Sequence, residues 1–377
     1  MIGLALAALN GYSNGMINRL GPFAAALLSL TCTSFPLHAD RLVLVAGGGQ
    51  QDPPCAATEV RLKEPFAAEL DPAGRLVIAE MAQGQRVLRL EADGKITRLA
   101  GTGAKGSGGD GGPALQAQFD GIHNFAIAAT GDIYFADTWN CRIRKLDAKT
   151  GILTSVAGTG EKGFAGDGGP ATAAKLGGIY CATLDFKNER LYLADLHNNR
   201  IRYLDLKTGL IQPFAGNGQK GVPKNGAKAA ESPLSDPRAV APDRLGNVYI
   251  LERGGNALRV VRPDGTIHTV VNASGKNGAE GDGGPALAAT MNGPKHLCVD
   301  RDDNVIIADA ENHLIRKFLP REGKIVRVAG TGKVGKAGLG SDPLQAGLSR
   351  PHGVFATADG TLYITDSYNN RVLKIVR

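Results

Sequence analysis

The sequence is poor in aromatic residues, which make up 5% of it and include one tryptophan, and it has no two cysteines in CxxC spacing. The lack of such pairs argues against a zinc knuckle or a thioredoxin-like redox motif. No segment places apolar residues at helical spacing over a useful length, which argues against a helix-rich fold. The formal charge of +7 on 377 residues is too small to indicate nucleic-acid binding by itself.

Glycine, in contrast, is abundant, with 52 residues among 377. This is about twice the ordinary share of roughly 7%. Because the glycines do not recur at every third position, a collagen-like chain is excluded, and their number indicates many tight turns. Hydrophobic residues make up 43% of the chain and charged residues 21%, which is enough apolar material for a sizeable core and excludes wholesale disorder.

The first 39 residues are typical of an export signal. Arg19 precedes a short apolar stretch at residues 23–30, and Leu37-His38-Ala39 forms a cleavage-like site before Asp40. We expect residues 1–39 to be a signal peptide, with Met16 as an alternative start, and residues 40–377 to be one domain of a secreted or periplasmic protein. The apolar stretch is too short for a stable transmembrane anchor. A buried N-terminal helix is the alternative interpretation.

Four cysteines follow this segment: Cys55, Cys141, Cys181 and Cys298. An oxidising compartment allows one or two disulfides among them, but their spacing does not assign the pairs.

A repeat of nearly constant length dominates the rest of the chain. Six short apolar runs end in an acidic residue, and successive acids are 57 or 58 residues apart. The acids are Glu80, Asp137, Asp195, Glu252, Asp309 and Asp366. Each unit contains four strand-like runs, called strands a to d, separated by turn residues, and the acid ends strand b.

Six four-stranded units in tandem predict an all-β, six-bladed β-propeller of antiparallel blades, because radial packing buries both faces of each sheet. A linear solenoid is the alternative. The sixth unit ends after strand c at residues 372–377, whereas the segment at residues 41–49 matches the strand-d pattern of residues 152–160 and 324–332. We therefore expect an N-terminal strand at about residues 41–47 to complete the last blade and close the ring.

The turn between strands b and c resembles the NHL repeat, as the segments that begin at Asp137, Asp195 and Asp366 show. The glycine-rich stretches between units, of which residues 157–171 are one copy, resemble it as well. The resemblance extends over residues 41–377 and implies a six-bladed propeller. It says less about function, because propellers of this family include sensors, adhesion modules, RNA binders and enzymes.

Two recurring features are expected to be structural. The acid of strand b and an arginine five positions later flank the b–c turn, so we predict latch pairs that hold this turn: Asp137–Arg142, Asp195–Arg200 and Asp366–Arg371. A catalytic acid beside an anion-binding arginine is the functional alternative. The GDGGP stretches lack the sequence of a phosphate-binding loop and the acid spacing of an EF-hand, so we interpret them as crossovers between blades.

Ligand binding is expected where the units differ at one equivalent place. Fourteen residues before each acid, or fifteen in the third unit, lies the residue that opens strand a: Phe66, His123, Tyr180, Arg238, Lys295 and His352. In a closed ring these six residues surround the mouth of the central channel, on the face that carries the d–a and b–c loops. The centres of the b–c turns on that face carry Trp139, His197, Glu311 and Tyr368.

These residues favour a binding module that takes a protein segment, a cell-envelope glycan or a small anionic molecule, with no cofactor and no nucleic-acid partner. A metal-dependent lyase or lactonase-like enzyme with its site in the channel is the alternative. The resemblance extends to lyases that hold zinc with three channel histidines, but His123 and His352 supply two, and Arg238 stands in the third place. Lactonase-like propellers hold calcium with oxygen ligands, yet the six mouth positions contain no acid. Catalytic residues, ligand identity and oligomeric state remain open.

Overall fold

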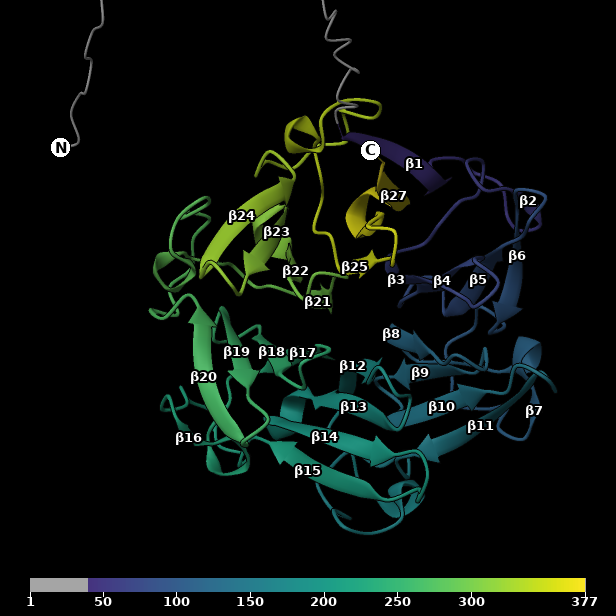
Figure 1. Ribbon diagram of the computed structural model, residues 1–377. Coiled ribbons are helices and arrows are strands. Elements are labelled where there is room, and N and C mark those ends of the chain that lie inside the picture. The colour runs from purple at the N-terminus through teal and green to yellow at the C-terminus, as the bar shows by residue number, and fades with distance from the viewer. Residues whose placement is uncertain (1–39, 377) are drawn as a thin grey trace, which may run out of the picture. The chain divides into compact units, whose positions relative to one another are not determined.

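The structure is a computed structural model that describes residues 40–376, and these residues form six sheets arranged in a ring around a central channel (Figure 1). Each sheet is a blade of antiparallel strands in which strand a lies next to the channel and strands b, c and d follow in order toward the outside. The predicted all-β six-bladed propeller is confirmed. The predicted signal peptide, residues 1–39, lies outside the described residues. Between residues 40 and 376, no helix is both long and apolar enough to cross a membrane.

The six blades follow one another along the chain, and each contributes one strand of every kind. From blade one to blade six, strands a are β3 (Pro65–Leu70), β8 (Ile122–Ile127), β12 (Ile179–Leu184), β17 (Pro237–Pro242), β21 (His296–Val299) and β25 (Gly353–Ala356). Strands b are β4 (Leu76–Glu80), β9 (Ile133–Asp137), β13 (Arg190–Asp195), β18 (Val248–Glu252), β22 (Val305–Asp309) and β26 (Leu362–Asp366). Strands c are β5 (Arg86–Leu90), β10 (Arg142–Leu146), β14 (Arg200–Asp205), β19 (Ala257–Val261), β23 (Leu314–Leu319) and β27 (Arg371–Val376). Strands d are β6 (Lys95–Ala100), β11 (Ile152–Ala157), β15 (Ile211–Ala215), β20 (Thr266–Val271), β24 (Lys324–Ala329) and β1 (Arg41–Gly47).

Short elements occupy the loops. Three two-residue strands extend blades one, two and four: β2 (Cys55–Ala56), β7 (Gly112–Pro113) and β16 (Ala227–Lys228). Five single-turn 3-10 helices lie in the connections between blades: η1 (Ala114–Gln116), η2 (Ala171–Ala173), η4 (Ala229–Glu231), η5 (Ala286–Ala288) and η7 (Pro343–Gln345). Three more lie in b–c turns: η3 (Leu196–Asn198), η6 (Ala310–Asn312) and η8 (Ser367–Asn369).

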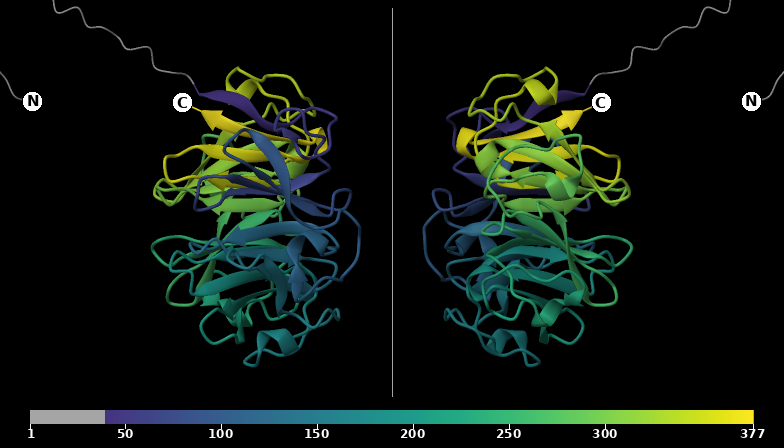
Figure 2. Two further views of the ribbon diagram at one scale, coloured as in Figure 1. Left: turned by 90° about the vertical axis from the view of Figure 1, so that its right-hand side faces the viewer. Right: turned by 90° about the vertical axis from the view of Figure 1, so that its left-hand side faces the viewer.

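The first described strand closes the ring, as expected. β1 pairs antiparallel with β27, with Leu42 opposite Ile375 and Leu44 opposite Leu373. The side views in Figure 2 show β1 in purple beside β27 in yellow. Blade six is therefore built from both ends of the described chain, and no strand c is left with an unpaired edge in that blade.

The glycine-rich crossovers cover the outer edge of each following blade. β7 pairs with β11, and bridges join Pro170 to Leu210 and Pro285 to Lys324 in the same way. Glycine is required in these crossovers. Gly166 has a φ of +90°, and a Cβ atom there would lie 2.7 Å from the Cα atom of Ala174. The crossovers thus protect strand d from pairing with another chain.

Apolar side chains of neighbouring blades pack against one another to form the core. One cluster extends from Tyr192 in blade three, through Ile250 in blade four, to Phe318 in blade five. Because each such cluster is shared, a blade buries its apolar faces only when both neighbours are present.

A buried arginine on strand c ties each of several blades to the crossover before it. Arg202 is fully buried, lies 3.5 Å from Asp195, and donates to the carbonyl oxygens of Lys175 and Ala165 at 2.9 Å. It also pairs with Asp167 of the GDGGP stretch. Arg144 and Arg316 repeat this pattern with Asp110 and Asp282, at 2.8 Å each. The aspartate of GDGGP is therefore a structural partner of a buried guanidinium.

These contacts correct one predicted latch and modify another. Asp195 faces Arg200 across the strand pair, but its ion pair is made by Arg202, seven positions after the acid. Arg200 instead donates to the carbonyl oxygens of Asn198 and Asn217, and its guanidinium lies over Phe164. Residues two apart on a strand share a face, so the long side chain at the later position reaches back to the acid.

The other two predicted latches differ in strength. Asp366 and Arg371 form a buried pair at 2.7 Å. Asp137 lies 3.8 Å from Arg142 but is also 3.6 Å from the fully buried Arg144. In blade two the arginine seven positions after the acid therefore carries the buried contact, as it does in blade three.

Replacing Arg202 by alanine is expected to lower the free energy of unfolding by about 3–5 kcal/mol, because two carboxylates and two carbonyl oxygens lose a buried partner. Arg200→Ala is the matched control and is expected to cost less than about 1 kcal/mol, since its side chain is partly exposed. Chemical denaturation of both variants measures the difference. Equal losses would contradict the assignment of the buried contact to Arg202.

Truncation of Leu42 tests the closure of the ring. This side chain is fully buried in a cluster with Ile306 of blade five and Ile375 of blade six. Leu42→Ala is expected to lower the free energy of unfolding by about 2–5 kcal/mol, since it leaves a cavity at the junction of the two chain ends. The neighbouring exposed Arg41 provides the control, and Arg41→Ala should change stability by less than about 0.5 kcal/mol.

Candidate functional site

The six residues expected at the mouth lie together at the beginning of the inner strands, and the acid of strand b positions each of them. In every blade this acid accepts a hydrogen bond from the backbone N–H group three residues before the mouth residue. These donors are Lys63, Asp120, Gly177, Ser235, Asn292 and Ser349, at 2.7–2.9 Å. The repeated acid thus holds the backbone in one conformation, whereas the side chain that follows differs from blade to blade.

The side chains of these residues contact one another around the channel, and we call them the mouth ring: Phe66, His123, Tyr180, Arg238, Lys295 and His352. The ring of Phe66 stacks on His352 with centroids 3.9 Å apart and meets His123 edge-on. His123 lies 4.4 Å from the ring of Tyr180, and the guanidinium of Arg238 lies 4.3 Å above that same ring. The aromatic half of the mouth ring is therefore closely packed.

Arg238 is the most unusual member of the mouth ring. It is only 5% exposed, yet its Nε and Nη1 atoms have no hydrogen-bond partner within residues 40–376. Burial lowers the pKa of its guanidinium to about 10. A buried guanidinium with unused N–H groups is costly for folding and is ready to donate to an acceptor from outside the protein.

The two histidines of the mouth ring are neutral at physiological pH. Burial lowers their pKa values well below the ordinary range, and the charges of Arg238 and Lys295 lower them further. The Nδ1 atom of His123 lies 3.0 Å from the Thr138 hydroxyl, and that of His352 lies 2.8 Å from the Arg350 carbonyl oxygen. The positive charge of the ring therefore resides on Arg238 and Lys295.

A chain of charged side chains continues from Lys295 to the b–c turns. Lys295 lies 3.0 Å from Glu311, which also pairs with Arg350, and Arg350 donates to the Tyr368 hydroxyl at 2.7 Å. Burial lowers the pKa of Lys295 to about 8, although the hydrogen bond to Glu311 opposes this shift. The single carboxylate of Glu311 thus serves two cations.

A polar cavity of about 440 Å³ opens over this part of the mouth. Its walls include Arg253, Lys295 and Arg350 on the basic side, Asp236 and Glu311 on the acidic side, and several asparagines. Lys295 is the member of the mouth ring that lines this cavity. Arg238 does not line it, but the charge of Arg238 contributes to the lowered pKa of Lys295. The space for a ligand therefore lies over blades four to six rather than evenly around the mouth.

The remaining predicted residues lie in the b–c turns around the mouth ring. Trp139 is 42% exposed, but one face of its ring covers Gly121 and its edge meets His123. The Nδ1 atom of His197 forms a hydrogen bond with the Gly177 carbonyl oxygen, and the ring of His197 meets that of Tyr180 edge-on. Tyr368 is 48% exposed and stacks with His352 at 5.8 Å. These turn residues support the ring from outside and present their other faces to solvent.

The mouth ring does not fit a divalent metal ion. His123 and His352 flank Phe66, and the third position of the expected histidine triad holds the buried cation Arg238. A zinc or calcium ion at this place would be repelled by Arg238 and Lys295. In the part of the chain that the structure describes, no group of three histidine, cysteine or acidic residues could hold a metal.

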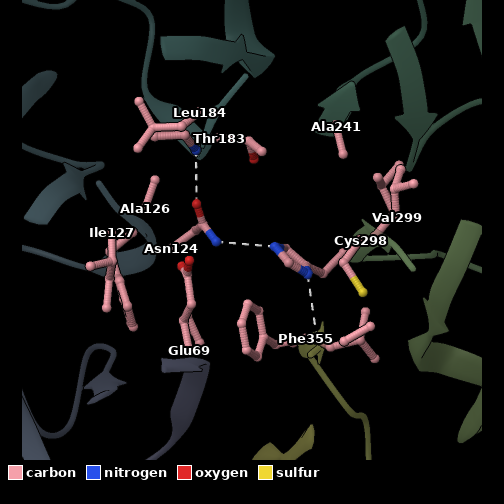
Figure 3. A pocket seen from close by; sticks show the side chains of 18 of the residues that line it. Glu69, Asn124, Ala126, Ile127, Thr183, Leu184, Ala241, Cys298, Val299 and Phe355 are labelled. Carbon is pink, nitrogen blue, oxygen red and sulfur yellow. Dashed lines mark hydrogen bonds between the residues drawn. The ribbon is translucent and has the colours of Figure 1, made fainter. Parts of the chain in front are cut away.

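A second cavity, of about 310 Å³, lies inside the channel and was not expected from the sequence (Figure 3). All six inner strands line it, and its polar groups include Glu69, Asn124, Thr183, His296 and Cys298. The Asn124 side chain accepts from the Ala182 N–H group at 2.8 Å and contacts His296 Nε2 at 3.0 Å. Continuing along strand a beyond the mouth residues would have identified Glu69 and Asn124 as variable polar positions.

The four cysteines in the described part of the chain are free thiols. Cys55, Cys141 and Cys181 are buried, and Cys298 lines the channel cavity. The disulfides that an oxidising compartment would allow are thus not formed in this structure.

The comparisons with known proteins agree with the fold. The NHL repeat family pattern matches residues 291–318 and 348–375. The chain is 26% identical over 340 residues to NHL repeat-containing protein 2 of Gallus gallus. The aligned region covers 83% of this chain and 46% of that protein. It is also 26% identical over 253 residues to Protein SUPPRESSOR OF QUENCHING 1, chloroplastic, of Arabidopsis thaliana. The aligned region covers 64% of this chain and 23% of that protein. The chain thus spans less than half the length of these curated relatives.

The fold also resembles solved propellers of low sequence identity. An auxiliary nutrient binding protein from Bacteroides thetaiotaomicron superposes on this chain with a TM-score of 0.66 at 14% identity. The superposition covers 89% of this chain and 76% of that one. At this identity the likeness establishes the arrangement of the blades and says nothing about the ligand.

Removing the charge of Arg238 is expected to raise the pKa values of His123 and His352, since this guanidinium is the largest charge that disfavours their protonated forms. NMR titration of the histidine ring signals in Arg238→Met measures the shifts. Lys187→Met, which removes an exposed charge from an a–b turn, should leave both values unchanged. Unchanged histidine pKa values in Arg238→Met would contradict the geometry of the mouth ring.

Proposed function

We propose that this chain, which matches the NHL repeat in two segments and folds as a six-bladed β-propeller, is an exported binding module that takes a small anionic ligand at the mouth of its channel. The ligand would lie on the face of the d–a and b–c loops, and export would depend on residues 1–39. The fold of an auxiliary nutrient binding protein is consistent with such a role.

The observation that carries this proposal is the uncompensated charge of Arg238. Its buried guanidinium has two unpartnered nitrogen atoms, and Glu311, an acid of the 440 Å³ cavity, is already shared by Lys295 and Arg350. Folding tolerates such a group at a cost, and a bound anion would supply the missing partner. The exposed Arg253 and the polar walls of the 440 Å³ cavity add donors beside it.

A carboxylate or phosphate group fits this arrangement better than a neutral ligand. Charged hydrogen bonds to an arginine and a lysine are short and strong, and three basic side chains surround one cavity. Asp236 and Glu311, which also line it, would disfavour positions of the anion next to their carboxylates.

Isothermal titration with citrate and with inorganic phosphate at low ionic strength tests this proposal. We expect Arg238→Met and Lys295→Met each to weaken binding by about tenfold or more, which corresponds to about 1.4 kcal/mol or more. Lys187→Met should bind as the unaltered chain does. If neither anion binds at about 10 mM, or if both mouth variants bind as well as the unaltered chain, the proposal is wrong.

The pH dependence of anion binding provides an independent measurement. Lys295 has a pKa lowered to about 8, and an anion favours its protonated form, so affinity should fall as the pH rises through about 8. In Lys295→Arg the side chain stays charged above that pH, so the affinity of this variant for the anion should change little as the pH rises. An affinity that is flat between about pH 7 and pH 9 in the unaltered chain would exclude Lys295 as a ligand.

A further inference from the structure

The channel cavity is separate from the mouth. Its lining includes no member of the mouth ring and no residue of the 440 Å³ cavity. It extends instead to Asp185, Phe186 and Asn188, which follow the end of β12 in an a–b turn. Because the mouth residues stand at the beginning of the inner strands, this cavity extends from below the mouth ring toward the opposite end of the channel.

The charges in this cavity are of one sign. Glu69 and Asp185 line it, and its lining contains no lysine or arginine. The Asp185 carboxylate accepts backbone hydrogen bonds from Glu189 and Arg190 within its own turn. Glu69 receives no hydrogen bond from a side chain in the described part of the chain, and Figure 3 shows its carboxyl group directed into the cavity.

His296, Cys298 and Cys181, which lie around Glu69, carry no charge at neutral pH. Burial lowers the pKa of His296 to about 4, so its imidazole is neutral. Burial also raises the pKa of Cys298 to about 12 and raises that of Cys181, so both thiols stay protonated. No cation within the cavity wall therefore compensates an ionised Glu69.

The rest of the wall is apolar and contains aromatic rings. Figure 3 shows Phe355 near Glu69 and places Leu184 and Val299 on other parts of the wall, and Phe125 and Phe186 line the same space. An ammonium group is attracted both to a carboxylate and to the face of an aromatic ring, whereas an anion in this cavity would meet only acids.

We propose that this cavity is a second binding site, which holds a small organic cation with an apolar body by pairing its ammonium group with the Glu69 carboxylate. The apolar part of the ligand lies against Val299, Leu184 and Phe355. A neutral ligand of the same shape fills the same space but leaves Glu69 without a charge partner.

The protonation of Glu69 distinguishes the two kinds of ligand. Burial raises the pKa of its carboxyl group to about 8, and a hydrogen bond with the Ile127 backbone opposes this shift. At neutral pH the free protein therefore holds the proton in most molecules. A bound cation favours the carboxylate, so binding releases the proton to solvent and strengthens as the pH rises through about 8.

The experiment compares choline with 3,3-dimethylbutan-1-ol, which has the same shape without the charge. Titration calorimetry of the full chain in two buffers of different ionisation enthalpy measures affinity and proton release together. We expect choline to bind more tightly than the alcohol by about tenfold or more, with a proton released only by choline.

Glu69→Gln removes the charge and keeps the shape of the side chain. It should weaken choline binding by about tenfold or more, abolish proton release and leave the alcohol unaffected. Glu189→Gln, which removes an exposed carboxylate from the a–b turn of blade three, is the matched control and should change nothing.

Three results would overturn the proposal: no choline binding at about 10 mM, equal affinity for choline and the alcohol, or unchanged choline binding in Glu69→Gln. The anion titrations of the mouth use different ligands and different variants, so the failure of one site does not bear on the other.

Discussion

The arrangement of the propeller depends on burying charge in a fully paired form. In several blades an arginine of strand c lies between the acid of strand b and the crossover that leads into the blade, and Arg144, Arg202 and Arg316 are completely buried there. A guanidinium in such a place is tolerated only if nearly all its donors are used. The crossover must therefore bring its carbonyl oxygens, and in three blades an aspartate, to fixed positions.

The same paired charges determine where function can reside. The acid of strand b also accepts a backbone hydrogen bond from the segment that enters strand a, three residues before each mouth residue. The backbone at the mouth is therefore nearly the same in all blades, and only the side chains vary. Because the backbone is constant and only the side chains differ, Arg238, Lys295 and two neutral histidines lie together at one end of the channel without a change in the rest of the fold.

The two ends of the channel differ in the ionisable residues that they carry. Cations without enough acidic partners gather at the mouth, and an acid without a basic partner lies in the channel cavity. Between them, aromatic side chains of neighbouring blades in the mouth ring contact one another around the channel. A propeller of identical repeats could not separate charge in this way, since every position would occur six times around the axis.

Much of this architecture could be predicted from the sequence. The spacing of the acids predicted six blades, the strand-d pattern of residues 41–47 predicted the closing pair with β27, and equivalent positions predicted the members of the mouth ring. The predicted pair Asp195–Arg200 was wrong, because two arginines on one face of strand c satisfy the same spacing argument equally well. Glu69 was not predicted, because it lies three residues beyond Phe66 on strand a, and the equivalent positions of the units indicated only the residue that opens that strand.

The order of strands, the closure of the ring and the position of the mouth were thus determined by the sequence alone, because a repeat of constant length places equivalent residues at equivalent points around one axis. The tertiary structure alone decided which charges are paired and which are not. The hydrogen-bond partners of Arg202 come from segments tens of residues away, whereas two nitrogen atoms of Arg238 have no partner among the described residues. Burial, which makes this difference costly, exists only after the blades have packed together.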